Sequence, residues 1–151
     1  MSNYVEQNLM PNEKIVATGQ VHWWGYVPGA ALSISGLIVV ITSGVFGWFL
    51  LIAGVAGLVR AWMHSTSTEL AVTNKRVIAK FGFISRSTIE LLHGKVESFH
   101  VDQSILGRML NFGTVIVNGT GGAKTPIPRI AAPLDFRRQA LGVIEASQKT
   151  D

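Results

Sequence analysis

The sequence predicts an α+β membrane protein in which a two-helix transmembrane hairpin precedes an antiparallel β-barrel or sandwich with a short inserted helix and a C-terminal helix. Three observations predict this class. First, no Lys, Arg, Asp or Glu lies between Lys14 and Arg60. Second, short segments rich in β-branched residues follow this stretch. Third, the last part of the sequence has the apolar spacing of an amphipathic helix. The expected division is an N-terminal cytosolic segment over residues 1–22, the hairpin over 23–63 and the soluble domain over 64–151.

The apolar stretch from Trp23 to Met63 is about twice as long as one membrane crossing requires. A helix rises about 1.5 Å per residue and the hydrocarbon core is about 30 Å thick, so about 20 residues make one span. Two helices are therefore expected, over roughly 25–41 and 45–63, with a turn at Thr42-Ser43-Gly44. Trp and Tyr residues, which favour the membrane interface, stand near the expected helix ends. A buried hairpin in a soluble protein is the alternative.

Basic residues set the expected orientation of the hairpin. Its turn carries no charge, whereas Lys14 precedes the first helix, and Arg60 and Lys75 lie near or after the end of the second. The positive-inside rule then places both termini in the cytoplasm. The first apolar run is not a convincing secretory signal, because it starts late and leads into a second span.

Small residues recur at helical spacing through both expected spans. Gly47, Gly54 and Ala61 repeat every seven residues in the second span, and Gly29 and Gly36 mark the first. Small faces let membrane helices approach closely. These residues therefore predict either packing within the hairpin or a contact between subunits, and the sequence leaves both interpretations open.

After the hairpin, the hydrophobic period changes from that of a helix to that of a strand. Strands are expected over 69–73, 76–80, 87–92, 96–101, 114–118 and 124–129, with an extended segment over 14–21 before the hairpin. Turn residues separate them at 74–75, 81–85, 93–94 and 119–122. Pro126 and Pro128 restrict the last strand to a sheet edge, because proline has no N–H to donate.

Two helices complete the expected soluble domain. Ser104 is a favourable N-cap for a short helix over 105–110, and Leu106 and Leu110 of this helix are expected to be buried under the sheet. Pro133 suits the first turn of a C-terminal helix. One face of that helix is apolar, with Phe136, Ala140, Val143 and Ile144.

Three motifs stand out in the soluble part: Leu-Ala-Val-Thr-Asn-Lys-Arg-Val-Ile from Leu70, Asp-Gln-Ser-Ile-Leu-Gly-Arg from Asp102, and Phe-Gly-Thr from Phe112. They resemble the bacterial pleckstrin-homology-like (PH) domain family, in its membrane-anchored branch with two transmembrane helices before the domain. The resemblance covers most of residues 66–145. It implies a PH-like barrel in a multi-pass protein of the bacterial inner membrane, but one fold hosts many functions.

No constellation of residues predicts catalysis, a metal site or a cofactor. The sequence has no Cys, and His22, His64, His93 and His100 form no ligand pair and are expected to be ordinary surface or interface residues. The segment 119–125 lacks the glycines of a P-loop and is expected to be a hairpin turn. No long Lys/Arg block favours nucleic acid as a partner.

Basic residues are the remaining candidates for a binding site. The chain carries 13 Lys and Arg against 9 Asp and Glu, which suits a protein beside anionic lipid. Basic residues around the first hairpin bind inositide headgroups in eukaryotic relatives of the PH fold, so the resemblance makes Lys75, Arg76 and Lys80 the lipid-headgroup candidates. The spaced basic motif of those lipid binders is missing, which leaves a solvated basic face as the alternative. Arg108 is expected to be structural, by pairing with Asp102 or capping carbonyls.

The expected function is a membrane-anchored, non-enzymatic scaffold or interaction module at the cytosolic face of the inner membrane. Its expected partners are membrane lipid and an unidentified protein, and a lipid- or small-ligand-binding sensor is the alternative. A homo-oligomer is also expected, because small helix faces and exposed edge strands, such as the segment 15–21, favour self-association. Soluble relatives in the wider family form rings, which agrees with this expectation.

Overall fold

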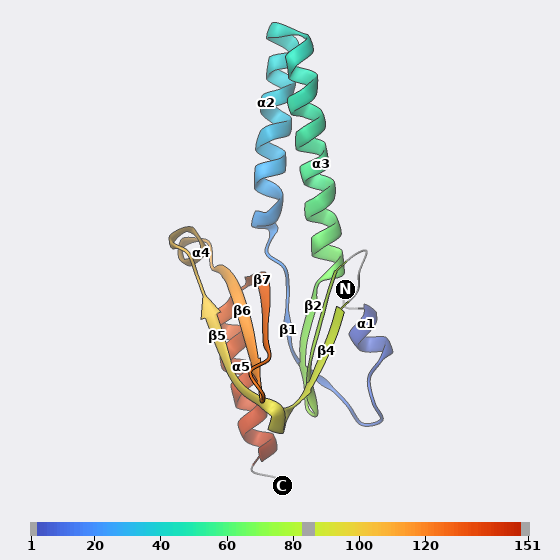
Figure 1. The fold of residues 1–151 in the computed structure, drawn as a ribbon, viewed down its shortest axis with the longest axis vertical. Helices are drawn as coiled ribbons and strands as arrows, with labels where there is room; N and C mark the ends of the chain where they lie inside the picture. The colour runs from blue at the N-terminus through green and yellow to red at the C-terminus, as the bar shows by residue number, and fades with distance from the viewer. Residues whose placement is uncertain (1–2, 83–86, 149–151) are drawn as a thin grey trace. The chain divides into compact units, whose positions relative to one another are not determined.

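The computed structural model of the chain describes residues 3–82 and 87–148 (Figure 1). It divides into a barrel unit, formed by Met1–His22 together with Ser67–Asp151, and a helical hairpin, Trp23–Thr66. The barrel unit is therefore discontinuous: the chain leaves it after β1 (Ile15–Gly19) and returns just before β2 (Glu69–Thr73). This differs from the predicted separate segment over 1–22, because β1 pairs with β2 and so belongs to the same sheet.

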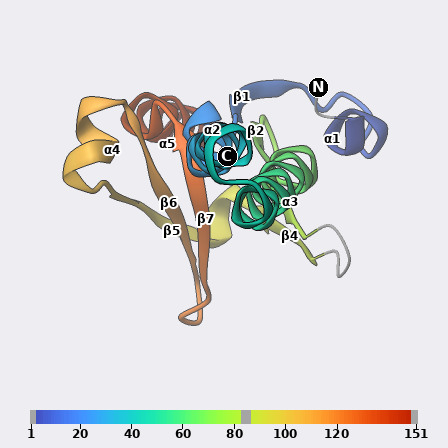
Figure 2. The same ribbon diagram turned by 90° about the horizontal axis from the view of Figure 1, so that it is seen from above.

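The barrel unit contains two antiparallel sheets, with the strand orders β1-β2-β3-β4 and β5-β6-β7. Figure 2 shows β2 and β4 on one side and β5 to β7 on the other. The remaining strands are β3 (Arg76–Phe81), β4 (Ser87–Leu92), β5 (Val96–Asp102), β6 (Phe112–Gly119) and β7 (Lys124–Ala131). These bounds confirm the predicted strands to within two residues at each end. The turn predicted over 81–85 falls largely on residues 83–86, which lie outside the described part.

The two sheets are joined just beyond the end of β1. Val21 forms an isolated antiparallel bridge with Ile130 of β7, and the His22 N–H donates to the Arg129 carbonyl at 2.7 Å. This segment was expected to be an open edge available to a second subunit. Its last residues instead pair within the chain and help to close the barrel.

Alternating side chains of both sheets fill the barrel interior. β6 shows the pattern most clearly, since every second residue is buried, as a strand with one inward face requires. The helix α5 (Pro133–Gln148) packs against this interior through Phe136, Ala140 and Ile144, which confirms its predicted apolar face. The rings of Phe99 and Phe136 meet edge to face, with centroids 6.3 Å apart.

The first sheet is also covered on its outer face. The short helix α1 (Asn3–Gln7) lies on this side, away from the second sheet (Figure 2). Val5 is fully buried there in a small cluster with Ala71 and Ile78. The central strands β2 and β3 are therefore buried on both faces, which explains why they read as continuous apolar runs rather than alternating ones.

The short helix α4 (Ile105–Met109) begins as predicted, since the Ser104 hydroxyl accepts a hydrogen bond from the Gly107 N–H at 3.1 Å. The prediction that Leu106 is buried under the sheet is wrong, and Leu110 is only half-buried. The residue of α4 that packs inward is Gly107, where a Cβ would lie 2.6 Å from the Phe112 carbonyl oxygen. This close backbone approach turns the larger side chains outward, leaving exposed fractions of 81% for Ile105, 53% for Leu106 and 76% for Met109.

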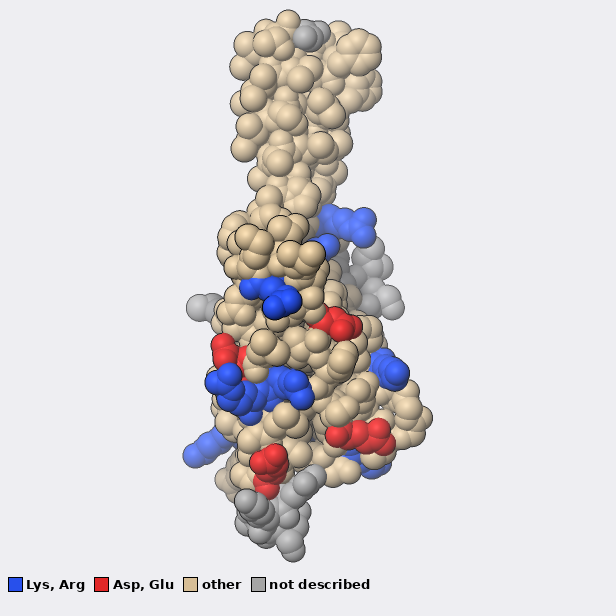
Figure 3. Space-filling view, turned by 90° about the vertical axis from the view of Figure 1, so that its left-hand side faces the viewer, with Lys and Arg blue, Asp and Glu red and all other residues tan. Residues whose placement is uncertain are grey.

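The helical hairpin consists of η1 (Trp23–Tyr26), α2 (Val27–Ser43) and α3 (Val45–Ser67). The two predicted helices are confirmed, but the turn is shorter than the predicted Thr42-Ser43-Gly44, because α2 continues through Ser43. The helix α3 also continues past its predicted end at residue 63. Two segments are long and apolar enough to cross a membrane, Trp23–Thr42 with 20 residues and Val45–Ser67 with 23. Most of their side chains are not buried, whereas a core helix of a soluble protein would bury them. Figure 3 shows no charged side chain over most of the hairpin.

Small residues let α2 and α3 pack closely. A Cβ on Gly47 would lie 2.2 Å from the Val40 nitrogen, and one on Gly54 would lie 2.4 Å from the Ser33 nitrogen. The third residue of the predicted small face, Ala61, is buried as well. Contacts within one hairpin therefore account for Gly47 and Gly54 without a second subunit.

Replacing Gly54 with Leu is expected to disrupt the hairpin, because the new side chain would overlap the backbone at Ser33. Overpacking of this kind costs about 1–3 kcal/mol or more. The thermal midpoint of the helical circular-dichroism signal, measured in detergent, should fall. Val55→Leu is the matched control, since Val55 is 46% exposed and should tolerate the change. Equal midpoints for the two variants would contradict the close helix contact.

Candidate functional site

The three basic residues chosen as lipid-headgroup candidates occupy different environments. Lys75 is exposed in the turn between β2 and β3, whereas Arg76, the first residue of β3, is only 5% exposed. Lys80 lies four residues further along β3, about 13 Å away at about 3.3 Å per residue. They do not form one exposed basic cluster, and on the face drawn in Figure 3 the Lys and Arg side chains are interspersed with Asp and Glu.

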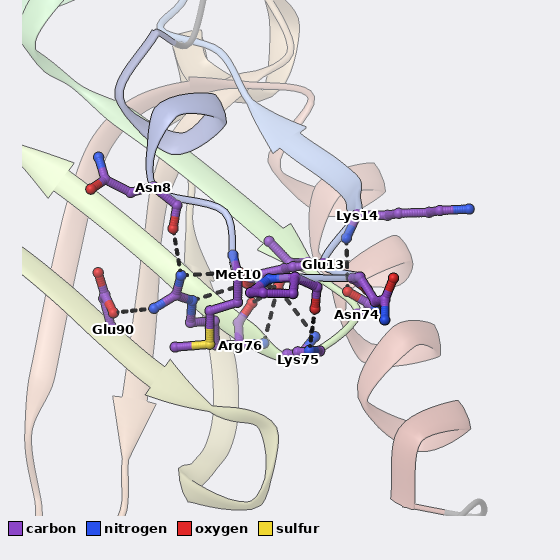
Figure 4. A network of polar contacts seen from close by, with 11 residues as sticks. Asn8, Met10, Glu13, Lys14, Asn74, Lys75, Arg76 and Glu90 are labelled. Carbon is purple, nitrogen blue, oxygen red and sulfur yellow. Dashed lines mark hydrogen bonds and ion pairs between the residues drawn. The ribbon is translucent and has the colours of Figure 1, made fainter.

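Arg76 is the centre of a buried polar network (Figure 4). Its Nε and Nη2 donate to the two carboxylate oxygens of Glu13 at 2.9 and 3.0 Å, which makes a bidentate pair. Nη2 also donates to the Asn8 carbonyl at 2.8 Å, and Nη1 donates to the Glu90 carboxylate. A buried charge is tolerated only when it is paired and hydrogen-bonded in this way.

Glu13 is as fully engaged as its partner. Its carboxylate also accepts hydrogen bonds from the Thr73 hydroxyl at 2.7 Å and the Met10 N–H at 2.6 Å. Burial alone would raise the pKa of Glu13, but these bonds and the Arg76 guanidinium hold that pKa below its ordinary value of 4.5. The hydrogen bond to Glu13 in turn raises the pKa of Arg76. Both residues stay charged, and the Arg76 guanidinium is committed inside the protein.

The other two candidates contact the same stretch of chain. The Lys75 ammonium donates to the Pro11 carbonyl at 2.8 Å. The Lys80 ammonium lies 4.3 Å from the centroid of the Tyr4 ring and 3.9 Å from a Glu69 carboxylate oxygen. All three residues therefore hold the N-terminal segment, residues 4–13, against the first sheet.

Glu69 strengthens this attachment by binding the start of α1. Its carboxylate accepts hydrogen bonds from the backbone N–H groups of Tyr4 at 3.2 Å and Val5 at 3.3 Å. Carboxylates are favourable beside helix N-terminal N–H groups. Sequence reasoning missed both Glu13 and Glu69, because no local pattern relates Glu13 to Arg76, which is 63 positions away.

His93 is a third buried ionisable residue, after Arg76 and Glu13, and its burial was not predicted from the sequence. It lies in η2 (His93–Lys95) and is 6% exposed, although a surface residue was expected. Its Nδ1 is 2.9 Å from the Ser147 hydroxyl oxygen of α5. The Ser147 hydroxyl also lies 2.8 Å from the Ile144 carbonyl oxygen, to which it donates. His93 thus ties the connection between β4 and β5 to α5.

Mild acid is expected to destabilise the barrel through His93. Burial lowers the pKa of His93 from its ordinary 6.5, and a hydrogen bond with the Thr73 backbone opposes only part of that effect. The unfolded chain therefore binds a proton at His93 more tightly than the folded chain does. The contribution of His93 to the free energy of unfolding is fully present above pH 6.5, and it is lost as the pH falls toward the pKa of the folded state. In His93→Gln, this slope of unfolding free energy against pH should disappear. Glu13 does not interfere, since its depressed pKa acts only below pH 4.5.

The remaining histidines show no metal site. Among residues 3–82 and 87–148, no group of three or more His, Cys, Asp or Glu side chains is placed to hold a metal ion. The His22 ring stacks on Phe112 with centroids 5.2 Å apart, and His100 Nε2 lies 3.0 Å from Asp102. Asp102 therefore faces His100, whereas its expected partner Arg108 is exposed.

The glycine-rich segment after Gly119 is the predicted hairpin turn. The Gly119 N–H donates to the Ala123 carbonyl at 2.9 Å, and Gly121 and Gly122 have φ angles of 93° and 82°, which favour glycine. The strand β7 follows rather than a helix, so no helix N-terminus is available here to bind a phosphate.

An open groove of about 520 Å³ lies at the α4 end of the barrel unit. It is lined by the ends of β5, β6 and β7, including Gln103, Phe112 and Arg129. The groove is shallow and mixed in character, which suits a surface contact better than an enclosed reaction site.

The comparison with protein families agrees with this architecture. Residues 26–142 match the family described as bacterial PH domain, a range that includes both hairpin helices, β2 to β7 and much of α5. Among solved structures, the chain is similar to a DUF1696 family protein with a pleckstrin-homology domain from Shewanella loihica PV-4, at 10% identity and a TM-score of 0.39. That alignment covers 98% of this chain and 90% of the other. No curated protein matched. The matched range exceeds half of the sequence, and the chain belongs to the bacterial PH domain family.

Proposed function

We propose that the chain is a membrane-anchored, non-enzymatic interaction module. The hairpin spans the bacterial inner membrane, both termini are cytoplasmic, and the barrel serves as a scaffold at the cytosolic face. One observation carries the proposal. A hairpin with two membrane-length apolar helices, whose side chains are mostly unburied, is inserted between two paired strands of a well-packed barrel. The lipid bilayer is the solvent in which such side chains are stable.

The barrel interior supports a role for the outer surface rather than for an internal pocket. Leu70, Val115 and Ile130 have exposed fractions of 2%, 0% and 0%, so packed side chains fill the space between the sheets. PH domains are in general interaction modules without catalytic activity. A pulldown of the intact protein from native membranes in mild detergent would identify the protein partner.

Reporter fusions test the topology. A fusion after Asp151 should behave as cytoplasmic and an insertion at the Gly44 turn as periplasmic, because Arg60 and Lys75 flank the hairpin and its turn has no charge. A periplasmic C-terminus would overturn the proposal, since the barrel would then face the other compartment. Adding two Lys residues at the turn provides a charge control and should weaken the preference.

A lipid- or small-ligand-binding sensor is the second candidate, and the groove near α4 favours it. Gln103 and Arg129 offer polar groups there, beside the apolar ring of Phe112. Mass spectrometry of the gently purified protein would detect a co-purified lipid or metabolite. Stoichiometric ligand that is lost on Arg129→Ala would favour the sensor over the scaffold.

Self-association is part of the proposal, although its basis changes. The small residues Gly47 and Gly54 are accounted for within the hairpin, so they no longer argue for a subunit contact. β4 and β5 each end a sheet and provide unpaired edges that favour strand pairing between copies. Mass measurement in detergent decides the subunit number, and a single monomeric species would remove the homo-oligomer from the proposal.

A further inference from the structure

The two most exposed large apolar side chains of the described barrel unit are on α4. Ile105 is 81% exposed and Met109 76%, and Leu106 of the same helix is 53% exposed. Single exposed apolar residues are ordinary on protein surfaces, but three on one five-residue helix form a local apolar cluster. The cluster is therefore a candidate contact surface.

α4 is held firmly in place although its side chains are exposed. The Gln103 side-chain amide donates to the Phe112 carbonyl at 3.0 Å and to the Gly107 carbonyl at 3.3 Å. Ser104 caps the helix, and Gly107 permits the close approach of its backbone to that of Phe112. The apolar cluster is thus presented by a rigid part of the barrel.

α4 also lies near the point where the chain leaves the barrel for the hairpin. Phe112, three residues after the end of α4, stacks on His22 with ring centroids 5.2 Å apart. His22 is the last residue of this part of the barrel unit, and Trp23 begins the first membrane-length segment. Three residues reach at most about 11 Å. When Trp23 stands at the membrane surface, α4 is within reach of the same surface.

The charges around α4 suit an anionic surface. Arg108 on α4 and Arg129 at the nearby end of β7 are both exposed. The nearest acidic residue along the chain, Asp102, is exposed as well, but it lies six positions before Arg108 and its carboxylate is 3.0 Å from His100 Nε2. Apolar side chains beside exposed cations are typical of segments that lie in the headgroup region of a bilayer.

We infer that α4 is a second membrane-contact site: Ile105, Leu106 and Met109 enter the bilayer interface, with Arg108 at the level of the lipid phosphates. The inference rests on the proposed function, since the hairpin must span the same bilayer. The barrel is then attached at two points, the hairpin and α4, which restricts the face that it presents to the cytosol.

Single-cysteine labelling tests this directly, because the chain has no Cys. The full-length protein is reconstituted in vesicles of phosphatidylethanolamine and phosphatidylglycerol that carry a nitroxide quencher high on the acyl chain. An environment-sensitive fluorophore is placed at Ile105→Cys and, separately, at Met109→Cys, both exposed positions that should not disturb folding. Ile52→Cys in α3 reports the hairpin, and Thr120→Cys, about 26 Å along β6 from Phe112, reports the opposite end of the barrel.

Blue-shifted and strongly quenched emission at both α4 positions, with Thr120 unquenched, is the expected result. Adding Leu106→Glu should reduce the quenching at Met109→Cys several-fold. Quenching at Ile52 without quenching at the α4 positions overturns the inference but leaves the proposed function standing. Absence of quenching at Ile52 overturns both.

Two further outcomes also overturn the inference. A blue shift at the α4 positions without lipid quenching would mean that a second copy or another protein covers α4. Equal quenching at Thr120 and on α4 would mean that the contact is not specific to α4.

Discussion

Replacing Arg76 with Met is expected to destabilise the barrel unit by about 3–5 kcal/mol, because it leaves the buried Glu13 carboxylate without its cation. Glu13 has no exposed side-chain surface, so water cannot replace the lost hydrogen bonds. Hydrogen exchange of the β2 and β3 amides is a suitable measurement. Tryptophan fluorescence is not, because all four Trp residues lie in the hairpin.

Two further variants separate the ion pair from a general effect of losing positive charge. Lys75→Met removes an exposed ammonium with one hydrogen bond, to the Pro11 carbonyl, and should change stability by about 1 kcal/mol or less. The double variant Glu13→Leu with Arg76→Met should be less damaging than Arg76→Met alone, since no unpaired charge stays buried. If Arg76→Met lowered the free energy of unfolding no more than Lys75→Met, the buried network around Arg76 would not hold residues 4–13 against the first sheet.

Replacing Phe136 with Ala is expected to cost about 3–5 kcal/mol, the usual range for deleting a buried aromatic side chain. Phe136 is 4% exposed and anchors α5 to the interior beside Phe99. The free energy of unfolding should fall, and amides of α5 and β5 should exchange faster.

Leu106→Ala is the matched control for Phe136→Ala. Leu106 is 53% exposed, so its truncation should change the stability in detergent by about 0.5 kcal/mol or less. A cost for Leu106→Ala close to that of Phe136→Ala would mean that α4 packs against the barrel in solution, contrary to the structure.

The attachment of residues 4–13 changes the interpretation of the basic hairpin. Lys75, Arg76 and Lys80 all contact this segment, through Pro11, Glu13 and Tyr4. Arg76 in particular has little to offer an anionic headgroup, since it is 5% exposed and four of its five N–H groups donate to Glu13, Asn8 and Glu90. Arg108 and Arg129, which are exposed, are therefore better placed than Arg76 for the lipid contact that we propose.

Local patterns in the sequence determined the secondary structure of this protein. The length of the charge-free stretch predicted α2, α3 and a turn that includes Gly44, and β-branched runs between turn residues predicted β2 to β7. The apolar face of α5 was also predictable, because a period of 3.6 residues and a proline at the first turn are local signals. Such signals extend over a few residues and need no knowledge of where the chain returns.

Only the tertiary structure decided three features that bear on function. β1 joins the sheet across the whole hairpin, Arg76 is neutralised by Glu13 at 63 positions' distance, and α4 turns its large side chains outward because Gly107 packs against Phe112. Each of these features depends on which distant segments of the chain come into contact. A short amphipathic or basic sequence pattern is the same whether its side chains contact the core, another segment of the chain or the solvent. Pairing between distant residues, rather than periodicity, therefore determined which basic and apolar side chains of this protein stay exposed.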